Sequence, residues 1–339
     1  MKHGLVPPAR RRLDAALAVR RAVRVFLSEP EPAAHLCSGE LFVAVSGGAD
    51  SLALAEAAAH VGERRGLRVC ALVVDHRLQP GSSRVAERAA EEALRLGVHT
   101  AKVLPVTVDG PGGPEAAARR ARYATLREHA GDEALVLLGH TLDDQAETVL
   151  LGLGRGSGAR SLAGMRPLEV PWARPLLSTP RAVTRAACEE LGVRPWDDPH
   201  NADPRFRRVR VRREVLPLLE DVLAGGVADA LARTARQLRE DCDALDSIAS
   251  DVYGRACDGE ALRVDVLGQA PPPVRRRALR RWLLRGGVRE LTDAHLRSVD
   301  DLVGRWRGQG GVFLPGGVEA RRTHEKLVLN SCQSTTRGS

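Results

Sequence analysis

The 339-residue sequence has little of several features that would assign it to a common class. Its six cysteines are scattered and none form a Cys-x-x-Cys pair, so a zinc or iron–sulfur site has little support and a reducing cytoplasm is the expected environment. Aromatic residues make up only 3% of the chain, which argues against extensive base stacking on aromatic platforms. No long apolar run occurs, and Met1–Leu13 lacks the apolar core of a signal peptide. Neither a membrane span nor export is therefore expected.

Lysine is also scarce, being limited to Lys2, Lys102 and Lys326. No Gly-Lys-Ser/Thr sequence exists, which excludes the common nucleotide-binding P-loop. The net charge of +8 is nevertheless carried by many arginines, and the sequence pI of about 9.7 suggests a polyanionic partner. Because an arginine bias can reflect genome composition, clustering is better evidence than abundance.

The arginines form two clusters. The first cluster comprises Arg205, Arg207, Arg208, Arg210, Arg212 and Arg213, and the second comprises Arg275, Arg276, Arg277, Arg280 and Arg281. Either cluster suits contact with nucleic-acid phosphates, and a solvated helix face is the alternative for the second.

The most informative feature is a glycine-containing loop, Ser46–Ser51, directly after the apolar run Leu41–Val45. A strand, Ser-Gly-Gly and then a helix-forming run predict a phosphate cradle, because glycines let the backbone approach an anion and a helix N-terminus supplies N–H groups. The hydroxyls of Ser46 and Ser51 would add donors, and Asp50 could hold magnesium or orient a donor. A simple glycine turn between a strand and a helix is the alternative.

Apolar strands and helices alternate through the first half of the chain, which predicts a doubly wound, mostly parallel Rossmann-like α/β sheet. Expected strands are 41–46, 69–75, 100–108 and 134–139, and expected helices are 13–27, 51–65, 83–96 and 114–130. Ligands bind beyond the carboxyl ends of such strands. Three polar motifs lie at these ends, namely Ser46–Ser51, Asp75-His76 and Gly139-His140, so they are expected to form one site.

The second half of the chain no longer shows the regular alternation of strands and helices. Four prolines predict a loop region over 167–180, and Thr179-Pro180 is expected to open a helix that runs to about Leu191. Residues 209–256 are expected to be largely helical with a break near Gly225-Gly226. Helices near 273–285 and 292–306 and short strands at 312–314, 318–321 and 327–329 predict a small α+β C-terminal domain. We therefore expect a catalytic domain over 1–222, a helical connector and C-terminal domain over 223–331, and a disordered tail over 332–339.

The second chemical signal is the segment His140–Thr148. On a helix, His140, Asp144 and Glu147 would lie on one face at spacings i, i+4 and i+7, with Asp143 beside them. Carboxylates and an imidazole on one face can bind a cation, hold magnesium or perform acid–base chemistry. Helix capping by acidic residues is the alternative, although it does not account for His140 or Glu147.

These motifs together resemble two nested families. Ser-Gly-Gly-Ala-Asp-Ser (46–51) resembles the PP-loop of ATP pyrophosphatases, which cleave ATP between its α and β phosphates. With Val-Asp-His (74–76), Glu-Ala-Ala-Ala-Arg-Arg-Ala-Arg-Tyr (115–123) and His-Thr-Leu-Asp-Asp-Gln-Ala-Glu-Thr (140–148), the order is similar to that of tRNA(Ile)-lysidine synthetases. The resemblance is strong over about 38–222, and Leu314–Val318 also suits the family's C-terminal part.

The resemblance implies an adenine nucleotide alpha hydrolase-like fold and a carbon–nitrogen ligase. Such enzymes use ATP to adenylate the C2 oxygen of the wobble cytidine of CAU-anticodon isoleucine tRNA, release pyrophosphate, and let the lysine ε-amine displace AMP. The product, lysidine, changes codon reading from AUG to AUA. ATP, Mg²⁺, L-lysine and this tRNA are the implied ligands in a tRNA-processing role, and a homodimer is compatible with the sequence.

The resemblance also implies roles for particular residues. Ser46, Gly47, Gly48, Ala49, Asp50, Ser51 and Asp75 would form the ATP site, with Asp50 also placing the metal. His140, Asp50 and Arg122 would be catalytic: His140 would stabilise phosphate charge or transfer a proton, and Arg122 would contact phosphate. Asp144 and Glu147 would bind the lysine amine, while Arg205, Arg207, Arg208 and Arg210 would bind tRNA. Asp143 would cap the helix or contact magnesium, and for Asp75 a strand-end structural role is an equal alternative.

Two positions depart from the family pattern. Val209 stands where asparagine is common, and Gln79 stands where arginine is common. Both differences put individual RNA or loop contacts in doubt. A tRNA thiolase of the same superfamily is the nearest alternative enzyme, although it would need paired cysteines or a cluster. A small-molecule adenylating amide synthetase and a non-catalytic RNA-binding protein are the others.

Overall fold

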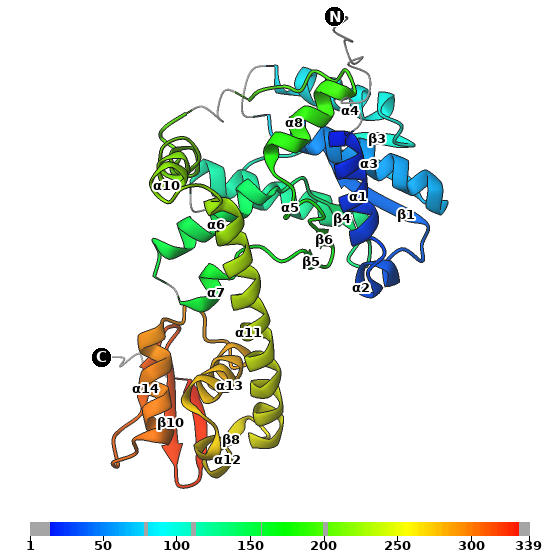
Figure 1. The fold of residues 1–339 in the computed structure, drawn as a ribbon. Coiled ribbons are helices and arrows are strands. Elements are labelled where there is room, and N and C mark those ends of the chain that lie inside the picture. Colours follow the sequence, from blue (N-terminus) through cyan, green and yellow to red (C-terminus); the bar gives the residue numbers. More distant parts are fainter. Residues whose placement is uncertain (1–13, 78–80, 110–112, 157, 199–202, 332–339) are drawn as a thin grey trace, which may run out of the picture. The chain divides into compact units, whose positions relative to one another are not determined.

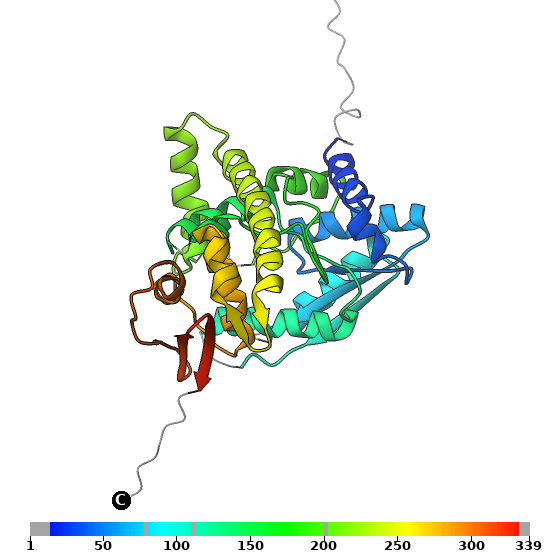
Figure 2. The same ribbon diagram turned by 90° about the horizontal axis from the view of Figure 1, so that it is seen from below.

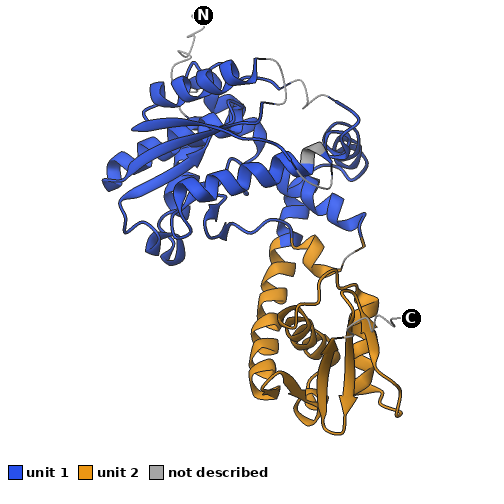
Figure 3. Ribbon diagram, turned by 180° about the vertical axis from the view of Figure 1, so that it is seen from behind, with its two compact units in different colours: residues 1–155, 164–235 blue, residues 156–163, 236–339 orange. Residues whose placement is uncertain are grey.

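The computed structural model describes residues 14–77, 81–109, 113–156, 158–198 and 203–331. Its chain divides into two compact units, one of residues 1–155 and 164–235 and the other of residues 156–163 and 236–339 (Figure 3). The expected tail over 332–339 and Gln79 lie outside the described residues. No helix in the described ranges has the length and apolarity needed to cross a membrane.

Unit 1 is built on a six-stranded sheet with the order β3-β2-β1-β4-β6-β5, parallel except for β5 (Figure 1). The strands are β1 (Glu40–Ala44), β2 (Arg68–Asp75), β3 (Thr100–Pro105), β4 (Val136–Leu137), β5 (Leu168–Glu169) and β6 (Trp172–Ala173). The predicted mostly parallel sheet is confirmed. The two-residue strands β5 and β6 lie within the proline-punctuated stretch that the sequence predicted as loop.

The helices of unit 1 follow the expected alternation. They are α1 (Asp14–Phe26), α2 (Pro30–Ala34), α3 (Ala49–Arg65), α4 (Ser82–Arg95), α5 (Pro114–Ala130), α6 (Leu142–Leu153), α8 (Arg181–Glu190), α9 (Arg207–Arg210), the π-helical turn η3 (Val211–Val215) and α10 (Leu216–Val222). α11 (Val227–Ala256) begins in unit 1 and continues into unit 2.

Both faces of the parallel sheet are buried, which explains why its strands are continuously apolar. On one face, Leu41, Val43 and Val69 pack with residues of α1, α3, α4 and α8. On the other, Phe42 and Leu72 pack with Leu126 of α5. Figure 2 shows helices of unit 1 on both sides of this sheet. Because successive strand residues point to opposite faces, apolar residues are needed at every position.

Unit 2 has its own core and an antiparallel sheet with the order β7-β8-β11-β10-β9. Its strands are β7 (Cys257–Asp258), β8 (Ala261–Arg263), β9 (Val312–Leu314), β10 (Val318–Thr323) and β11 (Lys326–Ser331). Its helices are α7 (Ala159–Leu162), α12 (Val264–Gln269), α13 (Pro272–Arg285) and α14 (Asp293–Gly304), besides the C-terminal part of α11. The expected α+β character is confirmed, and the β7–β8 hairpin adds two strands to the three predicted.

Candidate active site

The glycine loop leads from β1 into an uncapped helix N-terminus. Gly48 is the N-cap of α3 and has no side chain to cover the amides of the first turn. The buried hydroxyl of Ser51 accepts a hydrogen bond from the Ser46 N–H at 3.1 Å and donates to the Gly48 carbonyl at 2.9 Å. Ser51 therefore braces the loop, whereas Ser46 is exposed. The first-turn amides of α3 therefore lack a side-chain cap and can accept an anion.

Gly47 is required by both conformation and packing. Its φ of +83° lies in the left-handed region, and a Cβ there would lie 3.3 Å from the Ala89 Cβ. Its carbonyl accepts a 2.9 Å hydrogen bond from the N–H of Trp196. The loop is thus held between α4 and the segment that follows α8.

A second glycine brings the loop after β4 against the phosphate loop. A Cβ on Gly139 would lie 3.0 Å from the carbonyl carbon of Asp50 and 3.1 Å from the Ser51 nitrogen. The two backbones can approach so closely because residue 139 has no side chain. This contact places His140 and the start of α6 beside the ATP loop, as expected for parallel strands ending at one edge.

The structure corrects the expected position of His140. The helix α6 begins at Leu142 with Thr141 as N-cap, so His140 lies in the preceding turn and does not share a helical face with Asp144 and Glu147. Burial lowers the pKa of His140 to about 3, while the negative charge of Asp144 acts in the opposite direction. In the described part of the chain its Nδ1 is buried without a hydrogen-bond partner. His140 is therefore a neutral imidazole at physiological pH.

The capping roles of Asp143 and Asp144 differ from the expectation. Asp144 caps its own helix, since its Oδ2 accepts hydrogen bonds of 2.9 Å from the N–H and from the hydroxyl of Thr141. Asp143 instead caps α8, because its Oδ2 accepts the Arg181 N–H at 2.7 Å. The two acidic residues thus join α6 to α8 at the edge of the sheet.

Asp144 and Glu147, the acidic pair of α6, are surrounded by arginine side chains. The Glu147 side chain is fully buried and its carboxylate contacts Arg181 at 3.3 Å, Arg208 at 2.8 Å and Arg212 at 2.6 Å. Asp144 Oδ1 contacts Nη2 of Arg181 at 2.7 Å. Burial raises the pKa of Asp144, but the charges of Arg181 and Arg208 outweigh it and the pKa falls to about 2. Asp144 is thus ionised and is a weak proton acceptor.

Arg181 also connects the acidic pair to the ATP loop. Its Nε lies 3.3 Å from Oδ2 of Asp50, and the hydroxyl of Thr184 donates to the other oxygen of that carboxylate. Burial raises the pKa of Asp50, although Thr184 and Arg181 counteract part of the shift. One guanidinium therefore contacts carboxylates from α3 and from α6, the two parts of the candidate site.

Asp75 is buried at the carboxyl end of β2 and organises the turn into α4. Its carboxylate accepts the Arg77 N–H at 3.0 Å and the Ser83 hydroxyl at 2.6 Å. Burial alone would raise its pKa, but hydrogen bonds from Ser83, Ser82 and Arg77 produce a net lowering. These contacts support the strand-end structural role, and adenosine recognition stays a prediction.

Arg122 on α5 is hydrogen-bonded to a histidine. Its Nε donates to Nε2 of His76 at 3.2 Å. Burial and the neighbouring Arg122 charge lower the pKa of His76 to about 4, so its imidazole is neutral and can accept this hydrogen bond. Burial also lowers the pKa of Arg122. A cation in such surroundings favours an arriving anion, consistent with the phosphate contact expected for Arg122.

The four arginines expected to bind tRNA separate into different environments. Arg205 pairs with Asp203 at 2.7 Å and Arg210 with Glu214 at 2.8 Å, both on the surface. Arg207 is exposed, whereas Arg208 turns inward to Glu147. Their contact with tRNA stays a prediction, and Arg208 has a second partner that the sequence did not indicate.

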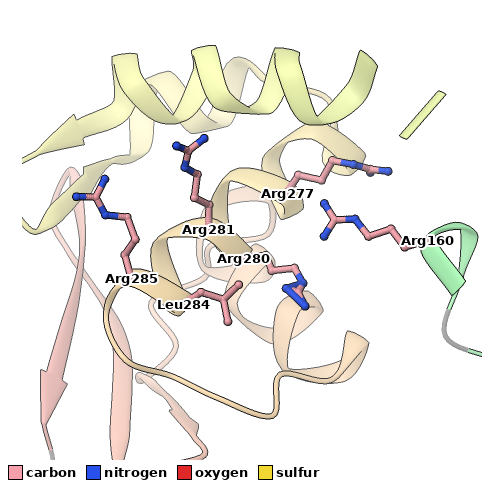
Figure 4. Close-up of a pocket in the computed structure, with 6 residues that line it drawn as sticks. All are labelled: Arg160, Arg277, Arg280, Arg281, Leu284 and Arg285. Carbon is pink, nitrogen blue, oxygen red and sulfur yellow. The ribbon is translucent and has the colours of Figure 1, made fainter. Parts of the chain in front are cut away.

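The arginines of the second cluster also lie in different environments, because successive positions of α13 face different sides of the helix. Arg275 is buried against Asp300 with a 2.6 Å contact, while Arg277, Arg280, Arg281 and Arg285 line a hollow of about 310 Å³ in unit 2 (Figure 4). Arg160 of α7 and Leu284 complete the lining. Arg277 and Arg160 both contact Asp246, at 2.8 and 2.6 Å. The hollow is a concentrated basic surface suited to phosphate.

Sequence reasoning assigned no role to several residues at the site. Arg181, Thr184 and His76 contact predicted site residues, Arg212 was noted only as a member of a charge cluster, and Arg160 was not singled out. Arg181 follows Thr179-Pro180, a helix-opening pair, and this was a usable signal. The role of Arg181 was nevertheless missed, because the preceding strand β6 has only two residues and no recognisable strand pattern.

The donor set at Asp50 restricts how a metal could bind. In the described ranges, no three His, Cys, Asp or Glu side chains are grouped to hold a metal ion. Mg²⁺ typically binds through one or two carboxylates together with substrate phosphates and waters. Asp50, whose side chain is 24% exposed beside the phosphate loop, fits that arrangement as a single protein ligand.

Comparison with known proteins agrees with this geometry. Residues 19–219 match the family model described as the PP-loop domain, and residues 262–328 match the TilS substrate binding domain. A U34-tRNA thiolase from Methanococcus maripaludis, solved with its [4Fe-4S] cluster, has a TM-score of 0.54 and 20% identity, covering 67% of this chain and 80% of that one. The chain therefore has a PP-loop ATP-binding fold.

Relatives of higher sequence identity show the family within the PP-loop proteins. The tRNA(Ile)-lysidine synthase of Rhodococcus erythropolis is 59% identical over 321 residues, covering 93% of this chain and 95% of the relative. Those of Mycolicibacterium paratuberculosis and Mycobacterium tuberculosis are 55% and 57% identical, covering 90% and 83% of this chain and 92% and 86% of the relatives. The chain belongs to the tRNA(Ile)-lysidine synthase family.

Proposed function

We propose that this chain joins the ε-amine of L-lysine to C2 of the wobble cytidine in CAU-anticodon isoleucine tRNA, using ATP and releasing AMP and pyrophosphate. The observation that carries the proposal is the contact between the phosphate loop and the acidic helix. Gly139 packs on the Asp50 backbone, and Arg181 contacts both Asp50 and Asp144. These contacts support the proposal, because an activating site for ATP and a site for a cationic nucleophile would then adjoin at one sheet edge.

In the first step, the cytidine O2 attacks the α-phosphate of ATP and pyrophosphate leaves. The first-turn amides of α3 would hold the phosphates, and Arg122 would oppose charge developing at phosphorus. Because His140 is neutral, it would assist through an N–H hydrogen bond to phosphate rather than through a full positive charge. A magnesium ion bound at Asp50 would neutralise phosphate charge.

In the second step, the lysine amine attacks C2 and AMP leaves. Asp144 and Glu147 would bind the lysine ammonium group and orient it. With a pKa of about 2, Asp144 serves as a counter-ion and not as the base that removes the ammonium proton.

The substrate tRNA would contact basic surfaces on both units. The exposed Arg205, Arg207 and Arg210 of unit 1 and the arginine-lined hollow of unit 2 are the candidates. A tRNA substrate makes the cytoplasm the expected location. The homodimer stays a prediction that light scattering of the purified chain can test.

The direct test is incorporation of labelled lysine into unmodified CAU-anticodon isoleucine tRNA, with and without ATP. We expect ATP-dependent incorporation that is lost in Asp144→Ala while tRNA binding persists. Initiator methionine tRNA, which shares the anticodon, is the specificity control. ATP-dependent sulfur transfer without lysine incorporation would instead identify a thiolase. tRNA binding with neither activity would indicate a non-catalytic RNA-binding protein, and full lysine incorporation by Asp144→Ala would contradict the role of Asp144.

A further inference from the structure

The carboxylates proposed to bind lysine already have cationic partners from the chain itself. Glu147 Oε1 accepts from Nε of Arg212 at 2.6 Å and from Nη1 of Arg181 at 3.3 Å, while Oε2 accepts from Nε of Arg208 at 2.8 Å and from Nη2 of Arg212 at 3.2 Å. Asp144 Oδ2 is used by Thr141, and its Oδ1 by Arg181. Every carboxylate oxygen of the pair therefore has at least one donor.

A lysine ammonium group would enter this cluster as a fourth cation. The three guanidiniums of Arg181, Arg208 and Arg212 already contact the carboxylates of Asp50, Asp144 and Glu147, and the Asp143 carboxylate accepts the backbone N–H of Arg181. An ammonium group needs two or three acceptors and is repelled by like charge at close range. Lysine can therefore pair fully with Glu147 only when at least one guanidinium withdraws.

The exposure of the arginines indicates which of them would withdraw. The Arg181 side chain is 14% exposed and is held by Asp50 as well as by the acidic pair. Arg208 and Arg212 are 30% and 29% exposed. Both lie in α9 and η3, a short segment whose other arginines include the exposed Arg207 and Arg210. Phosphates reaching this segment would compete with Glu147 for the two guanidiniums.

We infer that Arg208 and Arg212 block the lysine site until tRNA phosphates draw them from Glu147, so that lysine and tRNA bind with positive coupling. The inference rests on the proposed function, whose lysine site it regulates. It gives Arg208 two successive partners, Glu147 in the free protein and RNA in the complex. The consequence is that lysine binds productively only when the cytidine to be modified is present.

The first measurement is lysine affinity by calorimetry on the full chain without ATP, with and without unmodified CAU-anticodon isoleucine tRNA. Coupling between two sites commonly amounts to about 5- to 150-fold, and we expect the lysine Kd to fall by at least about fivefold when tRNA is present. Linkage requires saturating lysine to tighten tRNA binding by the same factor. Equal lysine Kd values in both conditions would overturn the inference.

Substitutions test whether Arg208 and Arg212 exclude lysine from Glu147 or only stabilise its carboxylate. Arg212→Gln and Arg208→Gln should each tighten tRNA-free lysine binding and reduce the coupling. Arg212→Lys keeps the positive charge and should retain the block. Arg95→Gln, which removes an exposed guanidinium of α4 that pairs with Glu92, should leave tRNA-free lysine affinity unchanged. Folded Arg208→Gln and Arg212→Gln proteins that bind lysine no better than the original chain would overturn the inference.

The result is distinguishable from failure of the proposed function. Absence of lysine binding even with tRNA, together with no labelled lysine incorporated when ATP is added, would contradict the proposed function. Lysine incorporation accompanied by equal lysine affinity with and without tRNA would contradict only the inference about Arg208 and Arg212.

Discussion

The two arginine clusters look alike in sequence and differ in what they contact. In the first, Arg208 and Arg212 point to the buried Glu147 of the candidate active site, while Arg205 and Arg210 form surface pairs with nearby acids. In the second, Arg275 pairs with buried Asp300 in the core of unit 2, and its neighbours on α13 line an open hollow. A run of arginines therefore predicts basic charge, but the face of the helix decides whether each charge is structural, catalytic or available to RNA.

The pairing of Arg275 with Asp300 depends on a glycine beside the guanidinium. A Cβ on Gly304 of α14 would lie 2.5 Å from Nη2 of Arg275, so the absence of a side chain there leaves room for the guanidinium. In the active site the corresponding close approach is at Gly139. Both glycines leave room for a close approach between segments that are separated in the sequence.

The largest effect should come from neutralising Glu147, the buried carboxylate that Arg208 and Arg212 of the first cluster both contact. Glu147→Gln leaves three guanidiniums around a neutral amide and removes a proposed lysine ligand, so we expect lysine incorporation to fall by about 10³-fold. Labelled-lysine incorporation measures this, with urea unfolding to check folding. Glu214→Gln, which removes an exposed acid from the same segment, is the control. Retention of more than a tenth of the activity in Glu147→Gln would contradict the role of this carboxylate.

The corresponding change in the second cluster should affect stability and not chemistry. Asp300→Asn leaves buried Arg275 without its counter-ion, and breaking such a pair typically costs about 3–5 kcal/mol. Urea unfolding followed by circular dichroism measures the free energy of unfolding. Asp293→Asn removes an exposed i,i+4 partner of Arg297 and should change it by about 0.5 kcal/mol or less. Equal effects of the two substitutions would show that burial of the Arg275 pair does not matter.

The hollow of unit 2 provides a smaller and salt-dependent effect. Arg277→Gln combined with Arg281→Gln should weaken tRNA binding by about tenfold and reduce the slope of log K against log salt by about one for each phosphate that is no longer neutralised. Filter binding at several salt concentrations measures both quantities. Arg297→Gln, an exposed arginine elsewhere in unit 2, should leave the slope unchanged. An unaltered slope in the double variant would indicate that the hollow is only a solvated surface.

A pH-dependent effect on stability concerns His140, whose pKa is lowered to about 3 by burial, with Arg174 and Arg208 adding to the lowering. The unfolded chain binds a proton at this position below about pH 6.5, and the folded chain does not. Stability should therefore fall as pH decreases from 7 towards 4, by up to about 1.4 kcal/mol per pH unit from this residue. His140→Gln should flatten that dependence in urea unfolding at several pH values. Parallel curves for the two proteins would show that folding does not lower the pKa of His140.

Much of the fold followed from patterns within short segments. The parallel sheet, its covering helices and the phosphate loop were predictable because apolar runs, glycines and helix-capping residues act locally. The strands β5, β6, β7 and β8 were not predicted, since two or three residues carry no periodicity. The order of motifs at the strand ends predicted that Ser46–Ser51 and Gly139-His140 would adjoin.

The sequence by itself determined the class of fold, the position of the ATP loop and the identity of the acidic pair, because these depend on residue types at fixed local spacing. The tertiary structure alone decided which cations surround that pair. Arg181, Arg208 and Arg212 are 34 or more residues from Glu147, and no periodicity links them to it. Burial decides the outcome physically, since a fully buried carboxylate must be paired and the fold determines which guanidiniums can reach it.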